Sequence, residues 1–301
     1  MSIIIPTYNR AFLIESVVRK TLEMDYENFE VVIIDDCSKD DTERIVKSIK
    51  DNRIKYIKHE IRMGAPKTKN DGVKHSTGEY ILFGEDDVHY DKGYLRKLMN
   101  CMDKNNADIV AGRIIYIKGN ENEKEATDRL DCLNKPVIDT KSITGNFSVK
   151  VNEDLEVPFV HALFLTKKKN FDNISYDENY LGNGYREETD PQISALRQGF
   201  KIVFCHDAVC YHLPKMQTID GGQHYMSKTK YIYWTIINNN YFLEKHYPFL
   251  KKRYCLKRSK KYMIISFACK TIITESLSLV YQKCKRSFKK LTFAKNIAKN
   301  R

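Results

Sequence analysis

The chain has 301 residues, of which 42% are hydrophobic and 30% charged, and its 51 Lys and Arg against 39 Asp and Glu give a formal net charge of +12. This composition excludes a disordered, collagen-like or coiled-coil chain. The charge is uneven, because residues 245–301 hold 17 basic side chains and one acid, whereas the other 244 residues hold 34 basic and 38 acidic groups. The mildly acidic body therefore predicts no nucleic-acid partner.

Eight cysteines are scattered without the spacing of a disulfide framework, so we expect reduced thiols. The first residues show no basic segment followed by a long apolar one, which predicts that no secretory signal is present. The sequence contains no run of 18 or more uninterrupted apolar residues, so it predicts no membrane span. Together these features predict a cytoplasmic protein.

Short β-branched runs alternate with amphipathic stretches over the first 120 residues. This alternation predicts an α/β fold with a mostly parallel, Rossmann-like sheet, flanked by helices and connected by right-handed crossovers. The expected strands are Ser2–Pro6, Phe29–Asp36, Ile54–Lys58, Tyr80–Phe83 and Ala107–Ile117, and the expected helices are Phe12–Met24, Asp41–Lys50, Lys67–His75 and Tyr94–Lys104.

The second half has a less regular pattern. Gly119–Ser142 is polar and charged without a clear period, so we expect a loop there. A helix is expected over Glu187–Gln198, because Gly199 follows it as a terminator, and a strand over Lys201–Cys205. Val157–Thr166 is expected to be ordered, and the segment around Gly221 and Gly222 to be mobile.

Three of the expected strands end in chemically active residues: Pro6-Thr7-Tyr8-Asn9-Arg10, Asp35-Asp36-Cys37-Ser38 and Glu85-Asp86-Asp87. Ligands of open parallel sheets bind at the carboxyl ends of the strands. Carboxylates gathered in one crevice need a cation, which predicts Mg²⁺ or Mn²⁺ and, with the metal, a phosphorylated ligand. For Asp35-Asp36 alone, capping of the next helix together with Ser38 is an alternative.

These segments resemble the family 2 glycosyltransferases of GT-A fold. The resemblance rests on I-I-I-P-T-Y-N-R from Ile3, V-V-I-I-D-D-C-S-K-D-D-T from Val31, G-E-Y-I-L-F-G-E-D-D-V from Gly78 and Y-R-E-E-T-D from Tyr185. It covers about residues 2–213, and four motifs in order are far more specific than any one of them. It implies a metal-dependent, inverting transfer of sugar from a nucleotide diphosphate.

The resemblance also implies residue roles. The family's Asp-x-Asp motif falls on Glu85-Asp86-Asp87, in which Glu85 is a departure from the commoner Asp. Glu188 is implied as the base that activates the acceptor, with Asp190 as the second choice, and capping of the helix is the alternative for this acidic cluster. The implied nucleotide-sugar contacts are Pro6, Thr7, Tyr8, Asn9, Asp36, Lys69 and Asp86, and the implied metal ligands are Asp87, Glu85 and His212.

Two of these roles have open alternatives. Lys69 stands where the family usually has Arg, so it either meets the diphosphate as a point charge or is a solvated helix residue. His212 either contacts the metal or the diphosphate, or packs without a chemical role, or belongs to a zinc site with Cys205, His206 and Cys210, although that spacing fits no well-known zinc pattern.

The expected domains are a transferase domain over 1–235, with a nucleotide-binding half (1–117) and an acceptor-binding half (118–235), and a basic helical extension over 236–301. Within the extension, Tyr262–Gln282 predicts an amphipathic helix with basic clusters on both sides. Such a helix either lies on an anionic membrane surface or docks on the transferase domain. The first option would make the protein peripheral on the inner face of the membrane.

The sequence therefore predicts a glycosyltransferase, of the hexosyltransferase class, that acts in the synthesis of cell-surface glycan, glycolipid or glycoprotein oligosaccharide. The expected cofactor is Mn²⁺ or Mg²⁺, and the expected partners are a nucleotide-diphosphate sugar and a glycan or lipid-linked acceptor. The alternatives are a non-catalytic, transferase-like glycan-binding protein and a nucleotidyltransferase. The second lacks support because Pro6-Thr7-Tyr8-Asn9-Arg10 is not a glycine-rich phosphate loop.

Overall fold

The computed structural model describes residues 1–140, 142–214 and 226–277. The chain divides into two units, Met1–Ser227 and Lys228–Arg301. The second unit begins with helix α7 (Lys228–Tyr254), so the boundary that we predicted after residue 235 falls inside a helix. The segment around Gly221, predicted to be mobile, lies outside the described residues.

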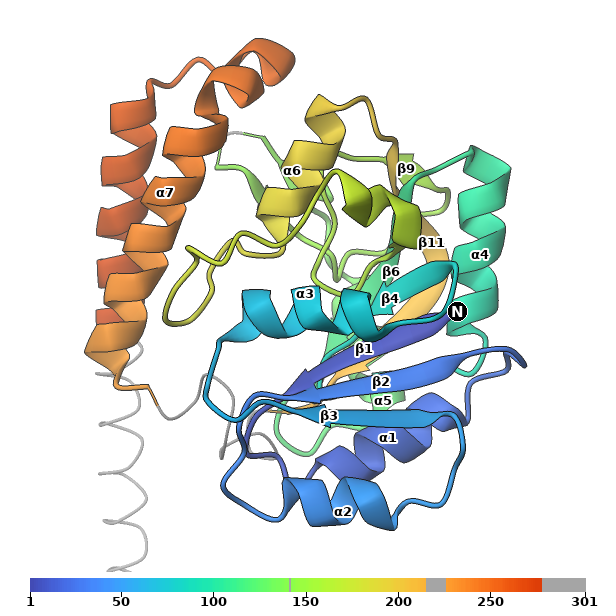
Figure 1. The fold of residues 1–301 in the computed structure, drawn as a ribbon. Helices are drawn as coiled ribbons and strands as arrows, with labels where there is room; N and C mark the ends of the chain where they lie inside the picture. Colours follow the sequence, from blue (N-terminus) through green and yellow to red (C-terminus); the bar gives the residue numbers. More distant parts are fainter. Residues whose placement is uncertain (141, 215–225, 278–301) are drawn as a thin grey trace, which may run out of the picture. The chain divides into compact units, whose positions relative to one another are not determined.

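The first 83 residues form four parallel strands joined by three helices (Figure 1). The predicted boundaries of these elements are confirmed to within two residues at each end. In chain order the elements are β1 (Ser2–Thr7), α1 (Ile14–Leu22), β2 (Glu30–Asp35), α2 (Thr42–Ser48), β3 (Ile54–Lys58), α3 (Ala65–His75) and β4 (Tyr80–Phe83).

The second half of the unit turns the sheet into a mixed one. The strand order is β3-β2-β1-β4-β10-β6-β11-β5, and β10 pairs antiparallel with both β4 and β6. β5 and β9 pair antiparallel with β11, whereas β6 and β11 are parallel. The elements are β5 (Val88–Tyr90), α4 (Tyr94–Asn105), β6 (Ile109–Tyr116), α5 (Glu123–Asp131), β7 (Ile138–Asp139), β8 (Thr144–Gly145), β9 (Leu155–Glu156), β10 (Leu165–Lys167), η1 (Lys168–Asp172), α6 (Thr189–Arg197) and β11 (Ile202–His212).

Apolar side chains cover both faces of the sheet, as the unbroken apolar strands predict. In β1, Ile3 and Ile5 join the core cluster that contains α1 and α4, and Ile4 joins the opposite cluster, which contains α6. All three isoleucines are fully buried. The sheet is therefore the middle of three layers, and it fixes the edge at which the strands end.

Two predictions about the second half are wrong in detail. Gly119–Ser142 is not a loop throughout, because it contains α5, which begins with a capping box between Asn122 and Glu125 and buries Ala126 and Leu130. The strand predicted to end at Cys205 continues to His212, with an irregularity in its pairing to β6 between Phe204 and Val209. This extension brings His212 beside Val88 of β5.

The C-terminal unit contains α7 and a second helix over residues 260–277. Ion pairs join Lys228 to Glu275 and Lys260 to Glu244, so the two helices run antiparallel. The predicted helix over Tyr262–Gln282 is confirmed as far as residue 277, and its remainder lies outside the described residues. None of the described helices has the length and hydropathy needed to cross a bilayer.

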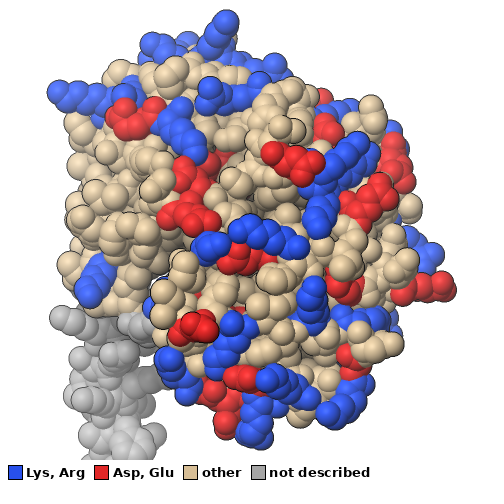
Figure 2. Space-filling view, viewed as in Figure 1, with Lys and Arg blue, Asp and Glu red and all other residues tan. Residues whose placement is uncertain are grey.

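Lys and Arg side chains alternate with Asp and Glu side chains on the face shown in Figure 2, where α1, α2 and β3 lie. Several of these charges form local pairs, such as Arg19 with Glu15 and Lys47 with Glu43. This part of the surface therefore carries charges of both signs.

The burial of His161 predicts that the stability of the fold depends on pH. Burial lowers the pKa of His161 to about 4, although its hydrogen bond to the Gly112 carbonyl opposes this shift. The unfolded chain then binds a proton between pH 6.5 and pH 4 that the folded chain does not, so this residue's stabilisation is lost as pH falls through that range. We therefore expect the free energy of unfolding, measured with urea, to fall less in His161→Gln than in wild type between pH 6.5 and pH 4, by on the order of 2–3 kcal/mol. An equal fall in both proteins would contradict the assignment.

Candidate active site

The ends of β1, β2 and β4 lie at one edge of the sheet, as predicted. Thr7 pairs with Asp35 in register, and the Asp36 amide donates to the Thr7 carbonyl at 2.9 Å. On the other side of β1, the Gly84 amide donates to the Ile4 carbonyl at 2.7 Å. The segments that follow these strands therefore surround a single site.

Asp36 organises the loop that crosses this edge. Its carboxylate accepts hydrogen bonds from the amides of Met63 and Gly64 at 2.7 and 2.9 Å, and His59 Nδ1 lies 3.1 Å away. Asp36 does not cap α2, which begins six residues later, after Asp41; its carboxylate instead binds the two amides that precede α3. The same loop places the guanidinium of Arg62 over the ring of Tyr8, 4.2 Å from its centroid.

The segment Glu85-Asp86-Asp87 contains three acids that are mostly or wholly withdrawn from water. Arg10 Nε lies 3.0 Å from Asp86 Oδ1, and Arg10 Nη2 lies 3.5 Å from Asp87 Oδ2. Burial raises the pKa of Asp86 to about 6, against the opposing effect of Arg10. Burial and the neighbouring Asp87 raise the pKa of Glu85 to about 7. One guanidinium therefore does not balance the negative charge.

Glu85, Asp87 and His212 offer three ligand atoms that lie within 4.8 Å of one another. His212 Nε2 lies 3.7 Å from Asp87 Oδ1, and the Leu213 amide holds the Asp87 carbonyl at 2.9 Å. Two carboxylates and an imidazole are a ligand set that suits Mn²⁺ or Mg²⁺. The residues present therefore fit the predicted metal.

Lys69 is not a solvated helix residue. Its ammonium group lies 2.7 Å from Glu187 Oε1, and both side chains are buried. Burial alone would lower the pKa of Lys69, but the carboxylates of Glu187 and Glu85 raise it above its usual value. The charged lysine thus joins α3 to the segment before α6, next to the acidic cluster.

The two predicted base candidates differ in their surroundings. Glu188 immediately precedes α6, is partly exposed, and its side chain makes no capping bond to the helix. Its charge contributes to the raised pKa of Glu85, in keeping with a position near the acidic cluster. Asp190 is 1% exposed and accepts a hydrogen bond from the Tyr180 hydroxyl at 3.0 Å.

The loop after β1 also contains Asn9, which stabilises the conformation of this part of the site. Asn9 has φ = 51°, its amide donates to Ser38 Oγ at 2.8 Å, and its side chain accepts from the Lys39 amide. Asn9 therefore ties the loop after β1 to the loop after β2. Pro6 and Thr7 lie at the end of β1, whereas Tyr8 is partly exposed beyond it.

Arg10 is a site residue that the sequence reasoning did not single out. It stands at the end of the first motif, but nothing in the sequence shows that its side chain turns back toward Asp86, 76 residues away. Arg62 and His59 were also missed, because they lie in a polar stretch without a motif. The available signal was that Arg10 is itself the last residue of a motif that follows an apolar strand.

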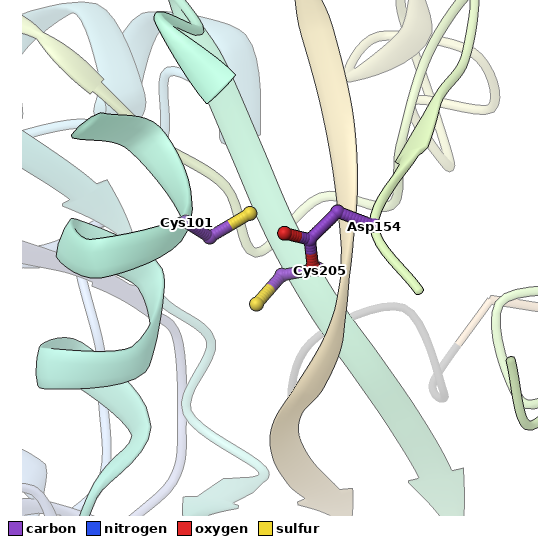
Figure 3. A group of neighbouring side chains, drawn as sticks. All are labelled: Cys101, Asp154 and Cys205. Carbon is purple, nitrogen blue, oxygen red and sulfur yellow. The ribbon is translucent and has the colours of Figure 1, made fainter. Parts of the chain in front are cut away.

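A second group of ligand atoms lies elsewhere, formed by Cys101 on α4, Cys205 on β11 and Asp154 (Figure 3). Asp154 accepts hydrogen bonds from His206 Nδ1 and Asn105 Nδ2 at 2.7 and 2.9 Å, which satisfies its carboxylate. A hydrogen bond with Cys101 and burial raise the pKa of Cys205 well above its usual value, so the thiol stays protonated. Because β11 separates this group from His212 by roughly 20 Å, we interpret it as structural.

Comparison with known proteins agrees with this geometry. The model of the family described as Glycosyl transferase family 2 matches residues 2–173, which is more than half of the chain. The chain belongs to glycosyl transferase family 2. The predicted family is thus confirmed, and the match includes three of the four motifs that carried the resemblance; the motif that begins at Tyr185 lies beyond the matched residues.

Two curated relatives illustrate the sequence similarity. A GalNAc(5)-diNAcBac-PP-undecaprenol β-1,3-glucosyltransferase of Campylobacter jejuni is 26% identical over 187 residues, which cover 61% of this chain and 56% of the relative. The poly(ribitol-phosphate) β-N-acetylglucosaminyltransferase TarS of Staphylococcus aureus is 29% identical over 173 residues, which cover 54% and 30%. The chain thus spans about half or less of the length of these relatives.

Two solved structures illustrate the fold. Residues 1–349 of Staphylococcus aureus TarS in complex with UDP-GlcNAc match with a TM-score of 0.56 and 17% identity, over 91% of this chain and 72% of that one. The mannosyltransferase PcManGT of Pyrobaculum calidifontis, in complex with GDP-Man and Mn²⁺, matches with a TM-score of 0.57 and 17% identity, over 92% and 74%. The predicted GT-A fold is confirmed.

The position of Arg10 predicts a stability effect that a metal should reverse. Arg10→Gln leaves the carboxylates of Asp86 and Asp87 without their nearest cation, so we expect the free energy of unfolding in EDTA to fall by about 3 kcal/mol. Added Mn²⁺ should restore part of this loss, as measured by urea unfolding. Arg19→Gln, which removes an exposed arginine, is the control and should change stability by less than about 0.5 kcal/mol; an equal loss in both variants would contradict the role of Arg10.

Proposed function

We propose that this chain transfers a sugar from a nucleotide diphosphate to an acceptor hydroxyl, with inversion at the anomeric carbon. The observation that supports this best is the single edge that brings together Tyr8, Asp36, the Glu85 to Asp87 segment and Glu188. Relatives in the same family are named glucosyltransferase and N-acetylglucosaminyltransferase. Structures of the same fold contain UDP-GlcNAc or GDP-mannose with Mn²⁺.

In this proposal the nucleoside binds where the loops after β1 and β2 meet. Tyr8 offers a ring for stacking and a hydroxyl, and Asp36 offers a carboxylate that four neighbouring groups already hold in position. Asp86, fixed by Arg10, faces the ribose or metal-bound water, and Lys69 contributes positive charge near the diphosphate from within its ion pair. Pro6, Thr7 and Asn9 shape the loop that presents Tyr8.

Glu85, Asp87 and His212 are the proposed ligands of Mn²⁺ or Mg²⁺. When bound, the metal would supply positive charge for the leaving diphosphate. The chain itself contributes the fixed geometry of these ligands, because the Leu213 amide donates to the Asp87 carbonyl and the tilted ring of Tyr116 contacts the His212 ring, with the centroids 5.0 Å apart.

Glu188 is the proposed general base. Its carboxylate takes the proton of the acceptor hydroxyl while that oxygen forms a bond to the anomeric carbon and the bond to the diphosphate oxygen breaks. The bonding electrons leave with the nucleotide diphosphate, and a single displacement inverts the anomeric centre. Asp190 is not assigned this role, because its buried carboxylate already accepts from Tyr180.

Glu188→Gln should lower the transfer rate by about 100-fold or more, because an amide cannot take the proton. Donor binding should remain, since the side chain makes no capping bond that α6 needs. The measurement is nucleotide release from a panel of UDP- and GDP-sugars with Mn²⁺, with and without a lipid-linked or glycan acceptor, and thermal shift reports donor binding. Glu156→Gln, on the exposed side of β9, is the matched control.

The outcomes separate the candidate functions. A protein that only binds glycans would release no nucleotide under any of these conditions. Full turnover in Glu188→Gln, with donor binding intact, would contradict the assignment of the base. A loss of turnover in both Glu188→Gln and Glu156→Gln would point to a folding defect and contradict the specific role of Glu188.

We also propose that the chain acts in the cytoplasm, peripheral on the inner face of a membrane, on glycan or lipid-linked acceptors used for cell-surface glycans. The described part of the helix over residues 260–277 leaves Ile265, Ile272 and Ile273 about half exposed. Exposed lysines such as Lys261 and Lys270 lie on the same helix. Such an apolar face flanked by lysines suits a surface of anionic lipid.

The cysteines support the proposed compartment. The seven described cysteines are free thiols, which suits a reducing compartment such as the cytoplasm.

Replacement of Ile265, Ile272 and Ile273 by Gln should weaken binding to phosphatidylglycerol vesicles by about tenfold or more, because it removes the apolar face. Co-sedimentation of the full chain measures this, and neutral phosphatidylcholine vesicles should bind weakly in every case. Ile61→Gln, at another exposed isoleucine, is the matched control. Equal binding by the triple variant and the control would favour docking of this face on protein.

A further inference from the structure

A pocket of about 360 Å³ lies in the first unit, among β6, α5 and the segment after β8. Its lining combines two kinds of side chain. Buried apolar residues, among them Ile114 and Leu130, form one part. Lys118, Arg129 and Lys135 form the other, and the two lysines are exposed. The pocket is thus suited to a ligand with both an apolar and an anionic part.

The charge in this pocket is only partly balanced. Arg129 forms two hydrogen bonds of 2.8 Å with Glu121. Lys118 and Lys135, by contrast, have no ion pair within residues 1–140, 142–214 and 226–277, and the lining contains no Asp or Glu among these residues. Two ammonium groups are therefore available to a ligand.

Tyr116 connects this pocket to the proposed catalytic edge. The residue lines the pocket, and its ring packs at a tilt against the ring of His212, whose Nε2 lies 3.7 Å from Asp87 Oδ1. Tyr116 therefore links the lining of this pocket to His212, next to the carboxylate of Asp87.

We propose that Lys118 and Lys135 bind a phosphate group of the acceptor, so that the acceptor substrates of this chain carry a phosphate or diphosphate close to the sugar that receives the new unit. The inference rests on the proposed function and deepens it. The acidic cluster repels such an acceptor, so the substrate needs cations beyond the carboxylates to hold its phosphate. Lys118 and Lys135 are placed to do this, and the apolar lining accommodates the group attached to the phosphate.

Binding of inorganic pyrophosphate, measured by titration calorimetry in EDTA, tests the site without the donor. EDTA removes divalent metal, so the acidic edge repels the anion and the cationic pocket is measured separately. Lys118→Gln with Lys135→Gln should weaken pyrophosphate binding by about tenfold or more, because each lysine contributes a charge-assisted contact. Lys124→Gln, an exposed lysine of α5 outside the pocket, is the control and should bind as wild type does.

Equal pyrophosphate binding in all variants, or no binding in wild type, would overturn the proposal. Competition then separates two sources of the phosphate. Farnesyl diphosphate should displace pyrophosphate more strongly if the acceptor is a lipid diphosphate, and ribitol 5-phosphate if it is a polyol phosphate; displacement by neither would overturn the proposal. A wild-type protein that releases no nucleotide from any donor would contradict the proposed function and leave the anion binding intact.

Discussion

The concentration of acids at one edge of the sheet is the constraint on which the rest of this structure depends. Glu85, Asp86 and Asp87 follow a buried strand, and Glu187 and Glu188 approach them from the segment before α6. Such a group is unfavourable without compensation, because each buried carboxylate loses its hydration. Burial accordingly raises the pKa of both Glu85 and Asp86. A cation is therefore the natural complement of the site.

The chain supplies part of this compensation from distant segments. Arg10 comes from the loop after β1 and Lys69 from α3, and each is buried against an acid of the cluster. These pairs require close packing of β1, β4 and α3. Gly84 shows how close that packing is, since a Cβ there would lie 2.9 Å from the Tyr90 hydroxyl and 3.2 Å from the Ile4 carbonyl. The same contacts that assemble the sheet thus hold its counter-charges in place.

The sequence predicted the parallel half of the fold and its strand-end carboxylates well, because β-branched runs and helical periods are local signals. It did not predict Arg10 as a site residue or the ion pair of Lys69 with Glu187, since these depend on side chains brought together across 76 and 118 residues. Helix α5 was missed although Asn122 and Glu125 form a capping box, because only Ala126 and Leu130 supply its apolar face. Antiparallel β5 and β10 have three residues each, too few for a period.

The distribution of charge also explains why the overall value of +12 was a poor guide to the chemistry. Function depends on local charge: the acids around Asp87 and the pocket lysines Lys118 and Lys135 form separate groups, which the contact between the rings of Tyr116 and His212 connects. A donor whose diphosphate is matched to a metal and an acceptor whose phosphate is matched to ammonium groups would occupy different places for an electrostatic reason. Two anionic substrates can then meet at Glu188 without competing for one cation.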